Sequence, residues 1–261
     1  MRSLKESLLD DDLDVSLDKQ IKQEIKDFLK LHFKGHSKCK ISRNPNSDGK
    51  HEVSSNGNIT HMVSKDPHGQ NLTNGRFIWT VVNGDFNCSR GVISLEGGPR
   101  KVTGDFHMEE SRYLTNLKGA PEEVGGSFRC NYSTSLASLE GAPKKVGVSF
   151  VCNFCLQLTS LEGAPEEVGD TFYCCHSKIT SLKGCPKVVN RLNLYGCKQL
   201  TSLKGAPKEV YKFDITDCTS LTSLEGAPKI LSSSPYSVRF RGTKFSDEDI
   251  EKAFKISRPI I

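Results

Sequence analysis

Seven copies of one short motif recur along the chain at almost constant spacing. Each copy reads like "SLEGAP", with variants such as "NLKGAP" and "SLKGCP", and successive copies are separated first by 22 and then by 21 residues. A repeat of this length predicts a solenoid, because no single copy can bury its apolar side without its neighbours. The leucine of the motif is found at Leu95, Leu117, Leu139, Leu161, Leu182, Leu203 and Leu224.

Within each copy, a short strand pattern follows the proline of the motif. In "APKEVYKFDITDCTSLTSL" the apolar residues Phe213 and Ile215 alternate with polar neighbours, the period of two that turns one face of a strand inward. Gly226 and Pro228 then end the regular structure. The pattern predicts a parallel β-sheet on one side of the solenoid, with irregular turn connections between the strands.

The apolar residues of the same copy spell L-x-x-L-x-L-x-x-C-x-x-L, and "CTSLT", "CKQLT" and "CLQLT" carry the cysteine. In this pattern the chain resembles leucine-rich-repeat proteins of the cysteine-containing variety. The stretches "SLKESLLDDDLD", "NPNSDGKHEVSS", "LTNGRFIW" and "VVNGDFNC" resemble repeat proteins encoded by gut bacteriophages and bacteria. These resemblances imply a leucine-rich-repeat-like solenoid, a phage or bacterial origin and a binding role.

Changes of pattern along the chain divide it into five segments. One stretch near the N-terminus places apolar residues largely on one helical face, and another near the C-terminus begins with Ser246, a good N-cap, followed by acidic residues. We expect a flexible acidic leader over residues 1–16, an amphipathic helix over 17–35, an N-terminal cap of short strands over 36–80, a solenoid of about eight strands over 81–245, and a capping helix with a tail over 246–261.

Composition limits where the protein works and what it binds. The N-terminus has no apolar core of signal-peptide length and no stretch is long enough to span a membrane, so we expect a cytoplasmic protein without a membrane partner. A reducing compartment makes a disulfide framework among the ten cysteines unexpected. The net charge of +5 is spread along the chain rather than concentrated in a basic stripe, which argues against a nucleic-acid partner.

The run Cys174, Cys175 and His176 raises the question of a metal or thiol site. Adjacent residues of a strand face opposite sides, so Cys174 points inward and Cys175 outward, and no second histidine or CxxC partner accompanies them. In register with the other copies, Cys88, Cys130 and Cys152 share the inward position of Cys174. We therefore expect buried thiols, no metal or other cofactor, and no catalytic residues.

Outward-facing strand residues are the part of the repeat that varies from copy to copy. Tyr and Arg are enriched among them, as they are at the centres of protein interfaces. The candidate partner-binding residues are His107, Arg129, Tyr132, Val151, Phe154, Tyr173, Cys175, His176, Asn193, Tyr195, Asp214 and Arg239.

Three functional hypotheses follow from the sequence. The first is a non-enzymatic scaffold that binds a protein partner through the exposed sheet face, with a host protein in the host cytoplasm as the partner of a phage-encoded chain. The second is a virion-associated or packaged structural protein. The third and least favoured is a metal- or thiol-dependent enzyme built around Cys175 and His176.

Overall fold

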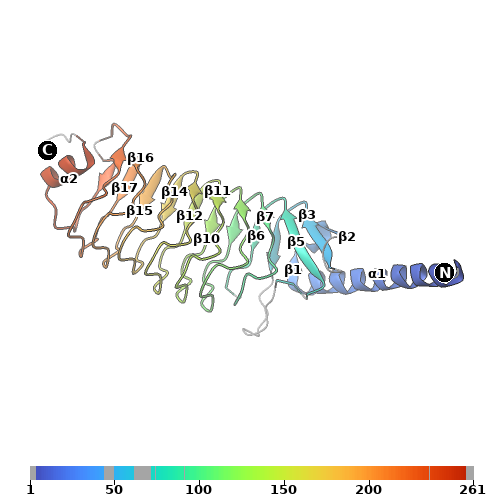
Figure 1. The fold of residues 1–261 in the computed structure, drawn as a ribbon. Helices are drawn as coiled ribbons and strands as arrows, with labels where there is room; N and C mark the ends of the chain where they lie inside the picture. The colour runs from blue at the N-terminus through green and yellow to red at the C-terminus, as the bar shows by residue number, and fades with distance from the viewer. Residues whose placement is uncertain are drawn as a thin grey trace.

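The chain forms an elongated solenoid in the computed structural model, with a helix at each end (Figure 1). The described residues are 4–43, 50–61, 72–73, 75–90, 92–234 and 236–256, and side chains are described from Val15 onward. Parts of the predicted segments, namely residues 1–3, 44–49, 62–71 and 257–261, lie outside this range.

Two sheets run along the solenoid, and neighbouring strands within them are parallel except at the N-terminal end. In the described part of the chain the longer sheet contains β1 (Phe33–Lys34), β4 (Ile59–His61), β6 (Phe86–Asn87), β8 (Phe106–His107), β10 (Phe128–Arg129), β12 (Ser149–Val151), β14 (Thr171–Tyr173), β15 (Arg191–Asn193), β17 (Lys212–Asp214) and β19 (Val238–Arg239), in that order. The shorter sheet contains β2 (Cys39–Arg43), β3 (His51–Ser55), β5 (Phe77–Val82), β7 (Lys101–Val102), β9 (Glu123–Val124), β11 (Lys145–Val146) and β13 (Glu167–Val168). A separate pair is formed by β16 (Glu209–Val210) and β18 (Lys229–Ile230).

Each sequence repeat forms one coil, which confirms the predicted solenoid. The register pairs equivalent residues of successive copies, as in Phe128 with Phe150 and Phe150 with Phe172. The shorter sheet was not expected, since the sequence predicted a sheet on one side only. Its two-residue strands centre on the valine three residues after each motif proline, such as Val124 and Val146, which is buried.

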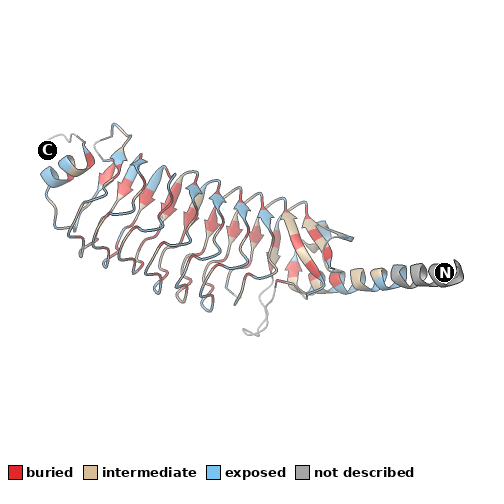
Figure 2. Ribbon diagram, viewed as in Figure 1, coloured by how far each residue is buried: buried red, intermediate tan, exposed pale blue. Residues whose placement is uncertain are grey.

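A stack of phenylalanine rings fills the interior behind the longer sheet. From Phe86 to Phe172 the rings of successive coils lie 5.1–5.5 Å apart between centroids and within 12° of parallel. The colouring of Figure 2 shows buried residues repeating along the strands of every coil. Ring stacking at the coil spacing therefore adds directional packing to the apolar burial that holds successive coils together.

Seven of the ten cysteines occupy two kinds of repeat position, an inward strand position (Cys88, Cys130, Cys152 and Cys174) and a turn position (Cys155, Cys197 and Cys218), and all ten are free thiols. Both groups are fully buried. In the inward group, Cys130 Sγ and Cys152 Sγ donate to the Val151 and Tyr173 carbonyls at 3.3 and 3.2 Å, and the second group lies at the turn. There Cys155 Sγ donates to the Cys130 carbonyl at 3.4 Å, and Cys197 Sγ donates to the Cys174 carbonyl at 3.0 Å. The turn thiol thus satisfies a carbonyl of the preceding coil, as Ser133 does through its hydroxyl.

Helix α1 (Leu4–His32) begins inside the segment that the sequence assigned to a flexible leader, and it is longer than the helix expected over residues 17–35. The chain has no Gly or Pro before Gly35, and nothing in it interrupts the helix. Ile25 and Leu29 are buried against the first coils, and Asp18 Oδ1 lies 2.7 Å from Nε2 of the buried His51. The short 3-10 helix η1 (His36–Lys38) then leads into β2.

The N-terminal cap proves to be part of the solenoid itself. Strands β3 and β5 pair in parallel in the shorter sheet, and β4 and β6 do so in the longer one. These segments form additional coils that lack the "SLEGAP" motif, and Trp79 fills their interior in place of the repeated ring. The antiparallel strands β1 and β2 cover the open edges of the two sheets, which protects them from pairing with other chains.

At the other end, α2 (Asp247–Phe254) covers the last coil as predicted. Ser246 and Asp249 form a reciprocal capping box, and the Phe254 ring packs 5.6 Å from that of Phe213. Neither helix of the described residues has the length and apolar character needed to cross a membrane.

Candidate functional site

The outer face of the longer sheet presents three columns of side chains, one residue of each column per coil. The first column follows the inward phenylalanine, as His107 follows Phe106 in β8. The second column contains Glu109, two residues further along, and the third contains Glu110, at the turn that ends the strand. Because the coils are in register, residues of one column lie next to each other along the solenoid.

Four aromatic side chains of the predicted site form a continuous row on this face. The rings of Tyr132 and Phe154 stack with centroids 4.9 Å apart, and Phe154 stacks on His176 at 4.6 Å. The ring of Tyr195 meets His176 edge to face at 4.9 Å. We call Tyr132, Phe154, His176 and Tyr195 the aromatic row, and its two ends are open to solvent, with Tyr132 51% and Tyr195 37% exposed.

Three members of the aromatic row have a left-handed backbone. Tyr132, Phe154 and His176 have φ angles of 58°, 58° and 55°, a conformation that bulky residues rarely adopt. Each backbone N–H at this turn donates to the next coil, as Phe154 does to the Cys175 carbonyl at 2.9 Å, so the stacking of coils fixes the conformation. The equivalent residue two coils beyond Phe154 is Gly196, with a φ of 70°.

Asparagine side chains support the row from the second column. Asn131 Oδ1 accepts a hydrogen bond from the Asn153 backbone N–H at 3.2 Å, and Asn153 Oδ1 accepts one from Cys175 at 2.8 Å. Asn193 Oδ1, which stands in the first column, accepts the Tyr195 N–H at 3.0 Å. These bonds hold the backbone beside each ring and orient the row.

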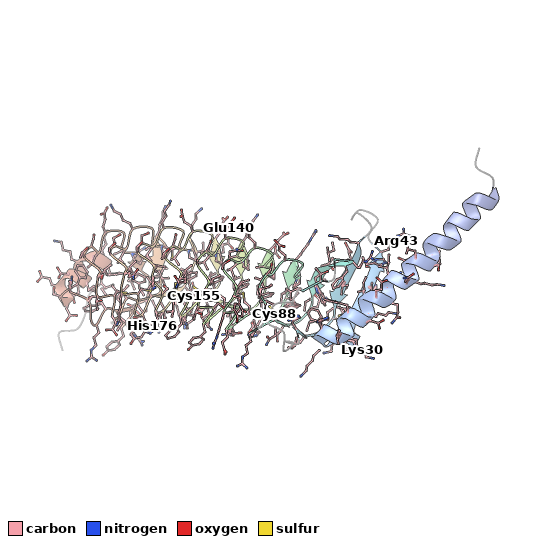
Figure 3. All side chains as sticks on the ribbon, turned by 90° about the horizontal axis from the view of Figure 1, so that it is seen from below. Lys30, Arg43, Cys88, Glu140, Cys155 and His176 are labelled. Atoms are coloured by element: carbon pink, nitrogen blue, oxygen red, sulfur yellow. The ribbon has the colours of Figure 1, made fainter. Side chains whose placement is uncertain are left out.

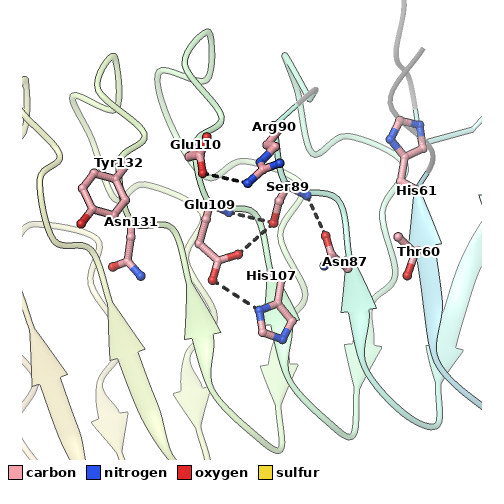
Figure 4. Close-up of a pocket in the computed structure, with 10 residues that line it drawn as sticks. All are labelled: Thr60, His61, Asn87, Ser89, Arg90, His107, Glu109, Glu110, Asn131 and Tyr132. Atoms are coloured by element: carbon pink, nitrogen blue, oxygen red, sulfur yellow. Dashed lines mark hydrogen bonds and ion pairs between the residues drawn. The ribbon is translucent and has the colours of Figure 1, made fainter.

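Toward the N-terminus the same face is polar and hollowed. A pocket of about 610 Å³ lies beside Tyr132, and Figure 4 shows the side chains of Ser89, His107 and Glu109 meeting in it. Ser89 Oγ donates to Glu109 Oε2 at 2.8 Å, and His107 Nδ1 lies 3.4 Å from Glu109 Oε1. Arg90 Nη2 and Glu110 Oε1 pair at 3.3 Å on its rim.

Charges in the pocket are balanced against each other. The hydrogen bond with Glu109 is the main cause that raises the pKa of His107, partly opposed by burial. Burial opposes ionisation of Glu109, but the hydrogen bonds from His107 and Ser89 prevail and lower its pKa. Glu109 is therefore ionised at neutral pH and anchors both neighbours.

This order of groups does not make a nucleophile of Ser89. In a Ser-His-acid triad the histidine stands between the other two and takes the proton of the serine. Here the carboxylate of Glu109 stands in the middle, and its lowered pKa makes it a weak base. The arrangement is suited to holding polar groups in place.

Cys175 and His176, the pair considered for thiol chemistry, are held apart from each other. Cys175 Sγ donates to Asn193 Oδ1 at 3.2 Å, whereas the His176 ring lies between Phe154 and Tyr195. Burial raises the pKa of the Cys175 thiol to about 12, so it carries no thiolate at neutral pH. Within the described residues no group of three or more His, Cys, Asp or Glu side chains could hold a metal ion.

The remaining predicted residues divide into exposed and covered ones. Val151 and Cys175 face outward but are only 6% and 8% exposed, because longer neighbours cover them, so they offer a partner little surface. His107 and Arg129 both approach Asp105 Oδ2, at 3.8 and 3.5 Å. Tyr173, Asn193, Asp214 and Arg239 line a second, smaller pocket of about 160 Å³ toward the C-terminus.

Sequence reasoning missed Ser89, Arg90, Glu109 and Glu110 as candidate site residues. Their columns were visible in the register, since Ser89 and Glu109 occupy the position of Asn131 in their own coils. The sequence gives no sign that these polar side chains meet, because their contacts run between neighbouring coils, as from Ser89 to Glu109 and from Arg90 to Glu110.

Comparison with known proteins gives no match, neither to a protein-family model nor to a curated protein nor to a solved structure. The function has to be argued from the geometry of the face.

Proposed function

We propose that this protein is a non-enzymatic scaffold that binds a protein partner through the outer face of its longer sheet. The aromatic row forms the centre of the contact, and the polar pocket around Glu109 lies beside it. Tyrosine and arginine side chains dominate the binding energy of protein interfaces, and here Tyr132, Tyr195 and Arg90 are exposed on one face.

The observation that carries the proposal is the left-handed backbone under the aromatic row. A left-handed conformation costs a residue with a side chain about 1–2 kcal/mol, and glycine avoids that cost. Gly196 and Gly242 show that the coil accepts glycine at this turn, yet every other described coil carries a side chain there, at Arg90, Glu110, Tyr132, Phe154, His176 and Asp217, and in three successive coils that side chain is a ring. Strain retained along this column points to a use for the side chains that bear it, and the column includes both the aromatic row and the rim of the polar pocket, at Arg90 and Glu110.

A triple substitution tests the proposal. Tyr132→Gly, Phe154→Gly and His176→Gly together remove the rings while leaving a residue suited to the backbone, so the solenoid is expected to stay folded. We expect recovery of a partner from host cells, measured by affinity capture and quantitative mass spectrometry, to fall at least about tenfold, the effect of losing about 1.4 kcal/mol of binding.

Tyr211→Ala is the matched control, because Tyr211 is 50% exposed but lies at the shorter-sheet side of its coil, against Val210. Its recovery of the same partner is expected to be unchanged. Equal recovery by the triple variant and the unmodified protein, with both melting at the same temperature, contradicts a binding role for the aromatic row.

We also propose that the coils are of the cysteine-containing leucine-rich-repeat kind, and that the protein is encoded by a phage and acts in the cytoplasm of the host. The cysteine that bonds the preceding coil, as Cys155 and Cys197 do, supports coils of the cysteine-containing leucine-rich-repeat kind. Ten free thiols suit a reducing compartment such as the cytoplasm. A phage-encoded chain that binds a host protein there is consistent with both observations.

A further inference from the structure

Helix α1 extends away from the solenoid for about half of its length. At about 1.5 Å per residue its 29 residues span about 43 Å. Figures 1 and 3, seen from two directions, show its N-terminal half reaching beyond the first coil. Val15 and Leu17 are 54% and 53% exposed, and Asp18 is the first described side chain of α1 that bonds to the solenoid, through His51.

Charge divides this helix into two opposite halves. Residues 4–18 contain six acidic side chains and one lysine, whereas residues 19–32 contain four lysines and two acidic side chains. The helix dipole favours such a distribution only within the first and last turn, but the acidic half extends over about four turns. The dipole alone therefore does not account for the division.

A basic hollow lies between the docked half of α1 and β2. It has a volume of about 520 Å³, and its lining includes Lys22, Lys26 and Lys30 with one acidic residue, Asp27, on the helix side, and Cys39 and Ile41 on the strand side. Lys22 already pairs with Asp18 at 2.7 Å, so Lys26 and Lys30 carry the positive charge offered to a partner. Lys26 and Lys30 are exposed, and the three lysines follow each other at intervals of four residues along one face. An acidic helix with some apolar residues fits this hollow in both charge and polarity.

We propose that two copies of this chain associate through antiparallel pairing of their α1 helices. Antiparallel pairing lays the acidic residues 4–18 of each copy along the basic residues 19–32 of the other. Each helix carries both an acidic and a basic half, so a two-fold axis between the helices pairs the acidic half of each copy with the basic half of the other. No complementary surface is then left over for a third copy, which is the geometry of a closed dimer. Parallel pairing would place like charges together.

Charge-reversed variants of the full chain test the pairing. Variant A carries Asp10→Lys, Asp11→Lys and Asp12→Lys, and variant B carries Lys19→Glu, Lys26→Glu and Lys30→Glu. Mass is measured by light scattering after size exclusion, over a range of protein concentrations and between about 0.05 and about 0.5 M salt, where screening increases. Far-UV circular dichroism reports whether each variant keeps its helix.

The unmodified protein is expected to be a dimer at low salt that dissociates at high salt. Variants A and B alone are expected to dimerise at least about tenfold more weakly, because attraction becomes repulsion at both ends of the pair. A chain with all six substitutions again has one acidic and one basic half, in exchanged order, and is expected to dimerise. A mixture of variant A, whose helix is net basic in both halves, with variant B, whose helix is net acidic in both halves, is expected to form a heterodimer.

Two results would overturn the proposal. One is an unmodified protein that remains monomeric at every concentration and salt tested. The other is a dimer whose affinity is the same in variant A, in variant B and in the sixfold variant, since such a dimer would use another surface. Both outcomes are independent of partner binding by the sheet face, which the triple glycine variant tests on residues far from α1.

Discussion

At the scale of single residues, the fold depends on columns that each demand one kind of side chain. The inward strand position, occupied by Cys88 and Met108, accepts compact apolar groups, and the turn position, occupied by Ser133 and Cys155, accepts a small hydrogen-bond donor. The third column of the outer face, which we call the left-handed column, is the position where glycine would have a lower conformational energy than the residues found. Phe154 and Gly196 occupy equivalent turns with φ angles of 58° and 70°. Substitutions should therefore be judged by column.

The left-handed column makes a prediction that conventional alanine scanning would miss. Phe154→Ala removes the stacked ring but keeps the strain, whereas Phe154→Gly removes both. We expect the glycine variant to be more stable than the alanine variant by about 1 kcal/mol in urea unfolding. At Tyr173, within β14, the order should reverse, because glycine weakens a strand. Alanine more stable than glycine at both positions would contradict this interpretation of position 154.

The same Cys→Ser substitution should have unequal effects at Cys155, in the turn position, and at Cys88, in the inward position. Cys155→Ser keeps a donor for the Cys130 carbonyl and is expected to change the unfolding free energy by less than about 0.5 kcal/mol. Cys88→Ser places a hydroxyl among apolar side chains and is expected to cost about 1–3 kcal/mol. Equal costs in thermal or urea unfolding would mean that the columns do not differ in polarity.

The alternation of inward and outward residues could be predicted at this scale, and with it the face that carries the aromatic row. The stacking of Tyr132, Phe154 and His176 could not, because it depends on a φ angle set by hydrogen bonds between coils. Gly196 and Gly242 in the same column were the available signal. The burial of Val151 was missed for a related reason, since the length of neighbouring side chains decides it.

At the scale of elements, close approach between coils limits what the corner between the two sheets accepts. A methyl group on Gly147 would lie 1.9 Å from the Gly125 carbonyl oxygen, and one on Gly169 would lie 2.0 Å from that of Gly147. Coils in register cannot move apart at one corner without losing ladder hydrogen bonds on both sides, so the clash has no local relief.

Gly147→Ala is therefore expected to destabilise the protein by more than about 3 kcal/mol, measured by urea unfolding. Val148→Ala, at the next and 46% exposed position, is expected to stay within about 0.5 kcal/mol. A Gly147→Ala variant as stable as Val148→Ala would show that the coils are looser than the structure indicates.

The docking of α1 gives the protein a pH dependence through His61. Burial, with the nearby His32 as a second cause, lowers the pKa of His61 to about 4, and neither ring nitrogen has a hydrogen-bond partner. Between the ordinary value of about 6.5 and about 4, the unfolded chain binds a proton that the folded chain does not. Stability is therefore expected to fall by about 1.4 kcal/mol per pH unit in this interval as pH decreases, and His61 contributes no pH dependence above it.

His61→Met provides the matched comparison, because Met108 stands at the equivalent inward position. The variant is expected to lose the contribution of His61 to this slope and to be more stable than the unmodified protein at pH of about 5. The unfolding free energy of both proteins is measured in urea at pH of about 7.5 and about 5. The same loss of unfolding free energy between the two pH values in both proteins would contradict the assignment to His61.

The shorter sheet shows why elements are harder to predict than columns. Strands such as β9 and β11 have only two residues, too few for any period to be recognised. A valine such as Val124 or Val146 stands three residues after the motif proline in six of the seven copies, and that regularity was the signal. The helical start of α1 at Leu4 was missed because a high density of Asp was taken to indicate a flexible segment.

At the scale of the whole molecule, a repeat of constant length largely determines the architecture, since equal copies can only stack in register. The solenoid and its parallel strands could accordingly be predicted from the spacing of the prolines and leucines, and the two terminal helices from a one-sided apolar pattern and the N-cap Ser246. The first coils could not, because β3 and β4 lack the motif and are recognisable only by their pairing with β5 and β6. The partner is beyond prediction from the fold, which different functions share.

The central claim is that the outer face of the longer sheet binds a protein, and site-specific photo-crosslinking tests it most directly. A photoreactive phenylalanine analogue placed at Tyr132 or at Tyr195, the exposed ends of the aromatic row, is expected to capture the same partner protein from host cells. The analogue at Tyr211, equally exposed but away from this face, should not capture it. Capture from Tyr211 alone, or of unrelated proteins from Tyr132 and Tyr195, would contradict the account.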